Sequence, residues 1–90
     1  QDTFGRLGGE EFGLLMPETH IEQALVVAER IRHVWEKSPV NLDGELITST
    51  ISIGLAEALA TDHSIEDVMR RADRLLYKAK ESGRNQVASE

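Results

Sequence analysis

The sequence predicts an α+β fold in which two amphipathic helices pack on one face of an antiparallel sheet. Apolar residues recur at helical spacing in two segments, residues 19–37 and residues 64–82. Short runs rich in β-branched and other apolar residues lie before, between and after these segments. Two turn signals, Gly8-Gly9 and Asp43-Gly44, each divide a pair of such runs. The predicted order is therefore ββ-α-ββ-α-β, as one layer of helices on one sheet.

The chain opens on a predicted β-hairpin. Residues 2–7 form a short extended run, and residues 11–16 read as a second strand that ends at Pro17. Gly8-Gly9 separates them, and glycine takes positive φ freely and lets a ligand approach the backbone. The turn is thus both a hairpin connection and a place where a ligand has room.

The first helix is predicted to start at Thr19, with Glu22 completing a capping box. It runs through about residue 37 and stops before Ser38-Pro39. Its apolar face consists of Ile21, Ala24, Leu25, Ala28, Ile31 and Trp35.

A second strand pair follows. Residues 40–43 form a short strand, Asp43-Gly44 is the turn, and residues 45–56 form a longer β-candidate. Gly54 within that run marks either a bulge or a close approach of another backbone.

The second helix is predicted to be capped by Ser64, with Glu66 and Asp67 in the first turn, where the helix dipole favours anions. Gly83 is its expected C′ residue. Residues 85–88 form a last strand. The apolar stripe of this helix consists of Ile65, Val68, Met69, Ala72, Leu75, Leu76 and Ala79.

Composition limits the classes of function. Ninety residues make one domain at most, and the formal charge of −6 argues against binding to a bulk polyanion such as duplex DNA. No apolar run reaches the length of a membrane span, and the absence of cysteine fits the cytoplasm. The cations are nevertheless concentrated in one stretch that could hold a small phosphate ligand: Arg70, Arg71, Arg74, Lys78, Lys80 and Arg84.

Two places carry candidate chemistry. Glu10 and Glu11 follow the glycine turn, and Mg²⁺ usually takes one or two protein carboxylates together with phosphate oxygens. Lys80 and Arg84 lie four residues apart, so on a continuous helix they share a face and could clamp a triphosphate. On spacing alone, a polar hairpin tip explains Glu10 and Glu11 better than a metal site does. In the same way, Lys80 and Arg84 are better explained as cations that offset the helix dipole than as phosphate ligands.

The remaining polar and aromatic residues are assigned no ligand. Glu66–Arg70 and Asp67–Arg71 are favourable pairs at i,i+4 spacing, and Trp35 and Tyr77 are expected in the core. The three histidines are read as surface residues: His20, His33 and His63.

Two motifs together resemble the GGDEF family. The run Arg6-Leu7-Gly8-Gly9-Glu10-Glu11-Phe12 matches the family signature in its Glu-Glu variant. The run from Ala72 to Asn85 is similar to the second signature, ADxxLYxAKxxGRN, and Ser52 to Ala56 is similar to the central strand. The resemblance covers residues 1–90 as the C-terminal part of a single GGDEF domain. It implies a palm-like fold, related to nucleotide cyclases, whose N-terminal strand and helices precede Gln1.

The resemblance implies a diguanylate cyclase that condenses two GTP into cyclic di-GMP, with two copies of the domain facing each other. It makes Glu10 a ligand of Mg²⁺ (or Mn²⁺) and an aid to deprotonation of the 3′-hydroxyl, with Glu11 as a neighbouring acid. It makes Gly8 and Gly9 the place where the nucleotide meets the backbone. Lys80 and Arg84 match the phosphate-contacting pair, and Arg6 matches an arginine near the reacting phosphates.

The resemblance also implies a product-inhibition site. Asp2 falls at the aspartate of an Arg-x-x-Asp motif whose arginine lies before Gln1, and Arg30 aligns with a second arginine that contacts bound product. An ordinary solvated helix residue explains Arg30 equally well. Because the family's metal-binding aspartate and guanine-reading residues also lie before Gln1, two alternatives stay open for this chain: a non-catalytic module that binds GTP or cyclic di-GMP, and a structural remnant.

Overall fold

The computed structural model describes residues 3–7, 13–16 and 20–90. Four strands form the main sheet in the order β2-β1-β5-β6, and they are β1 (Thr3–Leu7), β2 (Gly13–Met16), β5 (Ile53–Glu57) and β6 (Val87–Ser89). β1 pairs antiparallel with both β2 and β5, whereas β5 and β6 are parallel. The predicted antiparallel sheet is thus confirmed except for one parallel pair at its edge.

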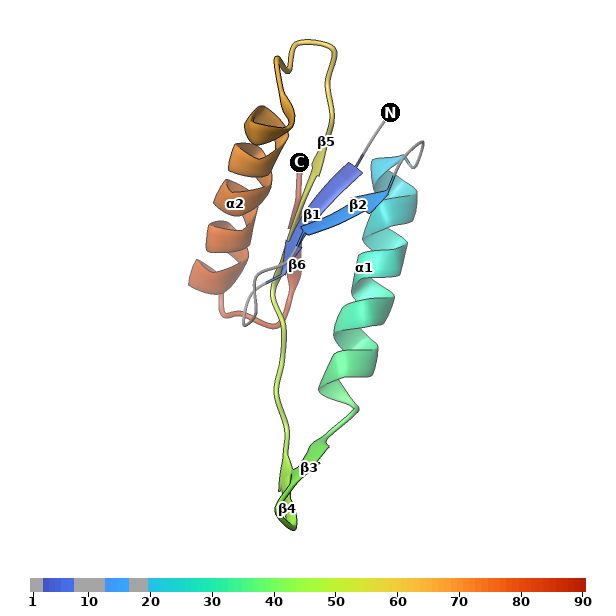
Figure 1. Cartoon of the computed structure of the whole chain (residues 1–90), viewed down its shortest axis with the longest axis vertical. Coiled ribbons are helices and arrows are strands. Elements are labelled where there is room, and N and C mark those ends of the chain that lie inside the picture. The colour runs from blue at the N-terminus through green and yellow to red at the C-terminus, as the bar shows by residue number, and fades with distance from the viewer. Residues whose placement is uncertain (1–2, 8–12, 17–19) are drawn as a thin grey trace.

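The two helices lie on opposite faces of this sheet, not on one face as predicted (Figure 1). α1 (Ile21–Glu36) and α2 (Ile65–Glu81) have the predicted positions in the chain. Ala24 and Ala28 of α1 pack with Ile53 and Leu55 of β5.

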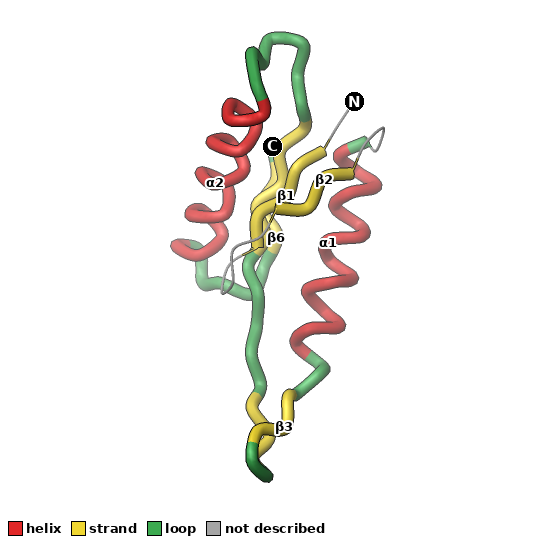
Figure 2. Tube along the Cα trace, in the orientation of Figure 1, coloured by secondary structure: helices red, strands yellow, loops and turns green. Residues whose placement is uncertain are grey.

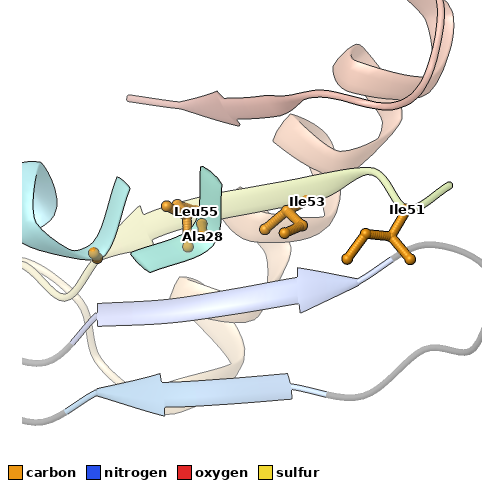
Figure 3. Close-up of a cluster of buried hydrophobic side chains, with 5 residues drawn as sticks. Ala28, Ile51, Ile53 and Leu55 are labelled. Carbon is orange, nitrogen blue, oxygen red and sulfur yellow. The ribbon is translucent and has the colours of Figure 1, made fainter. Parts of the chain in front are cut away.

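The opposite face of β5 packs against α2. Ala56 lies in a cluster with Val68 and Ala72 of that helix. Since successive side chains of a strand point to opposite faces, Leu55 packs against α1 on one side of the sheet and Ala56 packs against α2 on the other. Figure 3 shows Ile53 and Leu55 on β5, with Ala28 next to Leu55 and Ile51 in the segment just before the strand.

The burial of β5 explains the difference from the prediction. Residues 51–56 are all buried, so neither face of this segment is exposed to water. A run of apolar and small residues without polar alternation is typical of a strand covered on both faces. The residues Ile51, Ser52, Ile53, Gly54, Leu55 and Ala56 form such a run, with Ser52 as its one polar member.

Gly54 is a point of close approach between β5 and α2. A Cβ atom there would lie 2.3 Å from the backbone oxygen of Ala72 and 2.4 Å from the backbone nitrogen of Leu76. The pairing of β5 with β1 runs through Gly54 without interruption, opposite Arg6. Of the two predicted roles for this glycine, the close approach is confirmed and the bulge is wrong.

The second hairpin is separate from the main sheet. β3 (Val40–Leu42) and β4 (Glu45–Ile47) pair only with each other, and Figure 2 shows them far from the other strands. Asp43 and Gly44 both have positive φ, 52° and 86°, as a type I′ turn requires. The predicted long strand over residues 45–56 is therefore wrong, because it divides into β4, an irregular segment and β5.

Most helix ends follow the predicted signals. Ser64 is the N-cap residue of α2, and Gly83 follows its end with φ 117°. α1 begins at Ile21 with His20 as N-cap, one residue later than predicted, and Thr19 lies outside the described residues. The side-chain hydrogen bond predicted to cap the start of α1 is not made by the N-cap residue, His20.

The two aromatic side chains of the helices are exposed, which contradicts their predicted place in the core. Trp35 is 43% exposed and Tyr77 is 65% exposed. Trp35 continues the apolar face of α1 by one more turn than the residues that pack on β5, and its Nε1 donates a 2.9 Å hydrogen bond to Ser49 Oγ. Tyr77 follows the buried Leu76, so it points about 100° away from the sheet.

Candidate functional site

β1 and β2 form the first hairpin, and Leu7 ends β1 at one end of the sheet. β1 and β2 are in register from Thr3↔Met16 to Arg6↔Gly13, which confirms the predicted hairpin. Leu7 and Gly13 are the strand residues that flank the turn. The candidate residues Asp2, Gly8, Gly9, Glu10 and Glu11 lie outside the described residues, so their roles stay predictions.

The end of the sheet at which β1 finishes is also the end at which α2 finishes. Leu7 lies opposite Ile53, the first residue of β5, and Gly54 contacts α2 at Leu76. The other end of β5 packs near the start of α2, since Ala56 contacts Val68. Lys80 comes one turn after Leu76 and therefore lies at the end of the sheet at which β1 ends with Leu7.

Arg84 is not on the helix, so the spacing argument that gave it a common helical face with Lys80 is wrong. α2 ends at Glu81, and the Gly83 and Arg84 N–H groups donate hydrogen bonds of 3.4 and 3.0 Å to the Lys80 and Ala79 carbonyls. This pattern is a Schellman motif, in which the chain reverses directly after the helix. Because of this reversal, Arg84 lies next to the last turn of α2 although it is not part of the helix.

Lys80 and Arg84 differ in exposure. Arg84 is exposed, whereas Lys80 is half-buried and lines a hollow of about 200 Å³ together with Asp73, Leu76 and Tyr77. The structure thus brings the two predicted phosphate ligands to one helix end and leaves the arginine accessible.

A group of side chains that the sequence reasoning missed holds the residue after Arg84. Asn85 Oδ1 accepts a 2.8 Å hydrogen bond from Arg32 Nη1, and its Nδ2 donates to Glu36 Oε2. The Asn85 N–H donates a 3.1 Å hydrogen bond to Ser52 Oγ. The turn after α2 is therefore connected to α1 and to the segment before β5. The sequence offered one signal for this group. Arg32 and Glu36 are a cation and a carboxylate one turn apart in the first helix, and Asn85 ends the motif Gly83-Arg84-Asn85.

Asn85 also affects the acidity of its partner. Its hydrogen bond is the main cause that lowers the pKa of the Glu36 carboxyl, and the nearby cations Lys37 and Arg32 act in the same direction. Glu36 therefore stays ionised to lower pH than an ordinary glutamate and remains an acceptor for the asparagine amide.

Arg71 is held by carboxylates far from it in sequence, which contradicts its predicted pairing with Asp67. It forms ion pairs with Asp62 and Glu90 and donates a 2.9 Å hydrogen bond to the Glu57 carbonyl. Burial opposes the charge of Arg71, but the two carboxylates outweigh it and raise its pKa. Asp62, Glu90 and the Glu57 carbonyl therefore hold the Arg71 guanidinium in place.

Asp67 instead pairs with Arg70, and its side chain accepts a hydrogen bond from the backbone just before α2. It lies 3.5 Å from Arg70, at i,i+3 spacing rather than the predicted i,i+4 pairing of Arg70 with Glu66. Its Oδ2 accepts a 2.8 Å hydrogen bond from the His63 N–H, which is the main cause that lowers the pKa of Asp67.

Among the residues that the structure describes, no three His, Cys, Asp or Glu side chains form a group that could hold a metal ion. The three histidines are exposed, as predicted. In the same part of the chain no helix is long and apolar enough to cross a membrane. Arg30, the predicted product contact, is exposed on α1 and lines a hollow of about 490 Å³ with Val34, Trp35 and other residues.

Comparison with known proteins identifies the family. A family model described as "Diguanylate cyclase, GGDEF domain" matches residues 1–86. The chain belongs to the GGDEF domain family. Diguanylate cyclase A of Treponema denticola is 42% identical over 86 residues, which make up 96% of this chain and 23% of that protein. The response regulator PleD of Caulobacter vibrioides is 43% identical over 84 residues, or 91% of this chain and 18% of that protein.

Solved structures of GGDEF proteins have the same fold. The GGDEF domain of DgcB from Caulobacter crescentus, solved in complex with c-di-GMP, superposes with a TM-score of 0.83 at 33% identity. The match covers 91% of this chain and 48% of that one. Diguanylate cyclase SiaD from Pseudomonas aeruginosa, solved with its activator SiaC, gives a TM-score of 0.84 at 36% identity, covering 99% and 34%. The resemblance found in the sequence and the mixed helix-and-sheet fold class are both confirmed, and the chain spans half or less of each of these relatives.

Proposed function

We propose that residues 1–90 form the C-terminal part of a GGDEF domain and supply half of the active site of a diguanylate cyclase. One observation carries the proposal: the strands around Gly8-Gly9-Glu10-Glu11-Phe12 end where α2 presents Lys80 and, after its reversal, Arg84. The homologous diguanylate cyclases support it.

The reaction joins two GTP molecules, each held by one copy of the domain. The 3′-oxygen of each nucleotide forms a bond to the α-phosphorus of the other, and the bond from that phosphorus to pyrophosphate breaks. Two pyrophosphates leave and cyclic di-GMP forms. The 3′-hydroxyl must give up its proton to a base, and the extra negative charge on the phosphate must be offset.

The residues of this chain take complementary roles. Glu10 receives the proton, directly or through water, while Glu11 is a second acid beside it. Gly8 and Gly9 let the nucleotide approach the backbone. Lys80, Arg84 and Arg6 offset the charge of the phosphates, with Arg84 able to make two parallel hydrogen bonds to phosphate oxygens.

A divalent cation, Mg²⁺ or Mn²⁺, fits the donor set at this turn. Hard cations bind through carboxylate and phosphate oxygens, and Glu10 and Glu11 are adjacent carboxylates. When bound, the ion would lower the pKa of the 3′-hydroxyl and neutralise phosphate charge.

The proposed partners are GTP, cyclic di-GMP and a second copy of the domain, in the cytoplasm and without nucleic acid or membrane contact by this segment. Product binding by Asp2 and Arg30 is proposed as a second use of the chain. The complex of the DgcB domain with c-di-GMP supports it, as does the hollow that Arg30 lines together with the exposed Trp35.

The test compares two glutamates that each follow a glycine in a hairpin. The complete parent protein is incubated with GTP and Mg²⁺, and cyclic di-GMP is measured for the parent, Glu10→Ala and Glu45→Ala. Glu45 follows Gly44 at the exposed tip of the β3–β4 hairpin. We expect Glu10→Ala to lower the rate by at least about 10²-fold, as the loss of one stabilising group does, and Glu45→Ala to leave it unchanged. No product from the parent, or a Glu10→Ala variant as active as the parent, contradicts the proposal.

A further inference from the structure

The reversal after α2 contains three consecutive residues with positive φ. Gly83 has φ 117°, Arg84 has φ 63° and Asn85 has φ 47°. A glycine at C′ is sufficient for a Schellman reversal. Two further non-glycine residues in the left-handed region are unfavourable and persist only where the surroundings hold them.

The surroundings hold Asn85 through three of its polar groups. The side-chain oxygen accepts from Arg32, the side-chain nitrogen donates to Glu36, and the backbone N–H donates to the hydroxyl of Ser52. Ser52 is only 4% exposed, so its hydroxyl is fixed in the protein interior.

The α1 side of this arrangement is itself braced. Arg32 Nε and Nη2 donate to Glu29 at 3.1–3.3 Å, and the Arg32 side chain is only 18% exposed. The guanidinium is thus oriented by one carboxylate while its Nη1 reaches the turn. The other side of the turn is tied by Gln86, whose Nε2 donates to the carbonyls of Ser82 and Arg84.

We propose that Asn85, clamped by Arg32 and Glu36, is a positioning residue that fixes the direction in which Arg84 leaves the backbone and so directs its guanidinium toward the phosphate site. Because φ of Arg84 and φ of Asn85 define the path of the turn, a change at Asn85 rotates the Cα–Cβ bond of Arg84. The role of Arg84 on phosphate rests on the proposed function, whereas the clamp itself does not.

A double-mutant cycle tests whether Asn85 acts through Arg84. Steady-state cyclic di-GMP formation is measured in the complete parent protein for Arg84→Ala, Asn85→Ala and the double variant. We expect each single variant to raise KM for GTP about tenfold (about 1.4 kcal/mol) with a smaller change in kcat. The double variant should match Arg84→Ala within about twofold, since residues that act as one unit are not additive. Additive effects overturn the proposal.

Asn85→Gly separates the side-chain clamp from the backbone conformation. Glycine adopts positive φ freely but forms none of the side-chain hydrogen bonds. We expect its KM to rise as in Asn85→Ala, and a KM equal to that of the parent overturns the proposal. Glu22→Gln is the control on the same helix, because Glu22 is exposed in the first turn of α1, at the end of the helix away from Arg32 and Glu36, and its KM should stay within about twofold.

Amide hydrogen exchange gives a readout independent of catalysis. In Asn85→Gly the amides of residues 84–86 should exchange at least tenfold faster, while those in the middle of α2 keep their protection. Glu36→Gln, which keeps an oxygen acceptor but loses the charge, should give a smaller increase. Unchanged exchange at residues 84–86 refutes the clamp even if the parent makes cyclic di-GMP. Faster exchange in a parent without cyclase activity leaves the clamp standing and refutes the proposed function alone.

Discussion

Replacement of Gly54 by alanine should strongly destabilise the protein. The added Cβ would lie 2.3 Å from the Ala72 carbonyl oxygen and 2.4 Å from the Leu76 nitrogen. Both atoms belong to the backbone of α2, so the clash cannot be relieved by rotating a side chain. The helix would have to move away from β5 by about an ångström, and this would loosen the packing of Ala56 against Val68 and Ala72.

The expected cost is at or above the upper end of that seen for overpacked cores, about 3 kcal/mol. Folded proteins have a free energy of unfolding of about 5–15 kcal/mol, so the variant should lose a large part of it. Urea unfolding of the parent protein and the variant, followed by far-UV circular dichroism, measures the loss as a lower midpoint at unchanged slope.

Gly44→Ala is the matched control, because nothing lies within 4 Å of its Cβ position but its φ is 86°. Its cost should come from the backbone conformation alone, about 1–2 kcal/mol. If Gly54→Ala unfolds within about 0.5 kcal/mol of the parent, the size expected for a neutral surface substitution, the close approach of β5 and α2 is refuted.

Three further predictions concern charges and the exposed tryptophan. Arg71→Met should lower the free energy of unfolding by about 1–3 kcal/mol, because Asp62 and Glu90 lose a partly buried partner. Arg70→Met should cost under about 0.5 kcal/mol, because the Arg70 side chain is 72% exposed. Equal urea midpoints for the two variants contradict this prediction. The lowered pKa values of Glu36, Glu66 and Asp67 stabilise the fold above the ordinary carboxyl values of 4.5 and 3.8, and this contribution is lost as pH falls through the lowered folded values. Urea midpoints should therefore fall from pH 5 to pH 2, less steeply in Glu36→Gln, and a midpoint that rises on acidification would count against it. Trp35 is the one tryptophan of the sequence and is 43% exposed, so acrylamide should quench its fluorescence readily in the 90-residue chain, and a quenching constant typical of buried indole would place it in the core after all.

The sequence patterns predicted the order of the elements, except that β4 and β5 were predicted as one strand, because most of the elements have a local cause. Asp43-Gly44 specifies a turn with two positive φ values, and Gly83 specifies the end of α2. The placement of the two helices on opposite faces was missed, since periodicity shows which side of a helix is apolar but not which side of the sheet it meets. The buried run from Ile51 to Ala56 carried that information.

The site was predicted unevenly for a similar reason. Motif spacing found Lys80 and Arg84, but the reversal between them depends on backbone geometry that a four-residue spacing does not show. The clamp on Asn85 joins residues 49 and 53 positions apart along the chain. Pairs this distant leave no periodic trace in one sequence, and the same holds for Arg71 with Glu90.

The pairing of β1 with β5 bears on how the protein folds. β1 meets β5 only after about fifty intervening residues, from Thr3 to Glu57, whereas β5, α2 and β6 follow one another directly. Contacts between distant segments form slowly because a long loop must close first. During synthesis β1 and β2 are made before β5, so they lack this neighbouring strand until residues 53–57 have left the ribosome. The segment from β5 to β6 is thus the natural nucleus, and substitutions there should slow folding more than substitutions in the first hairpin.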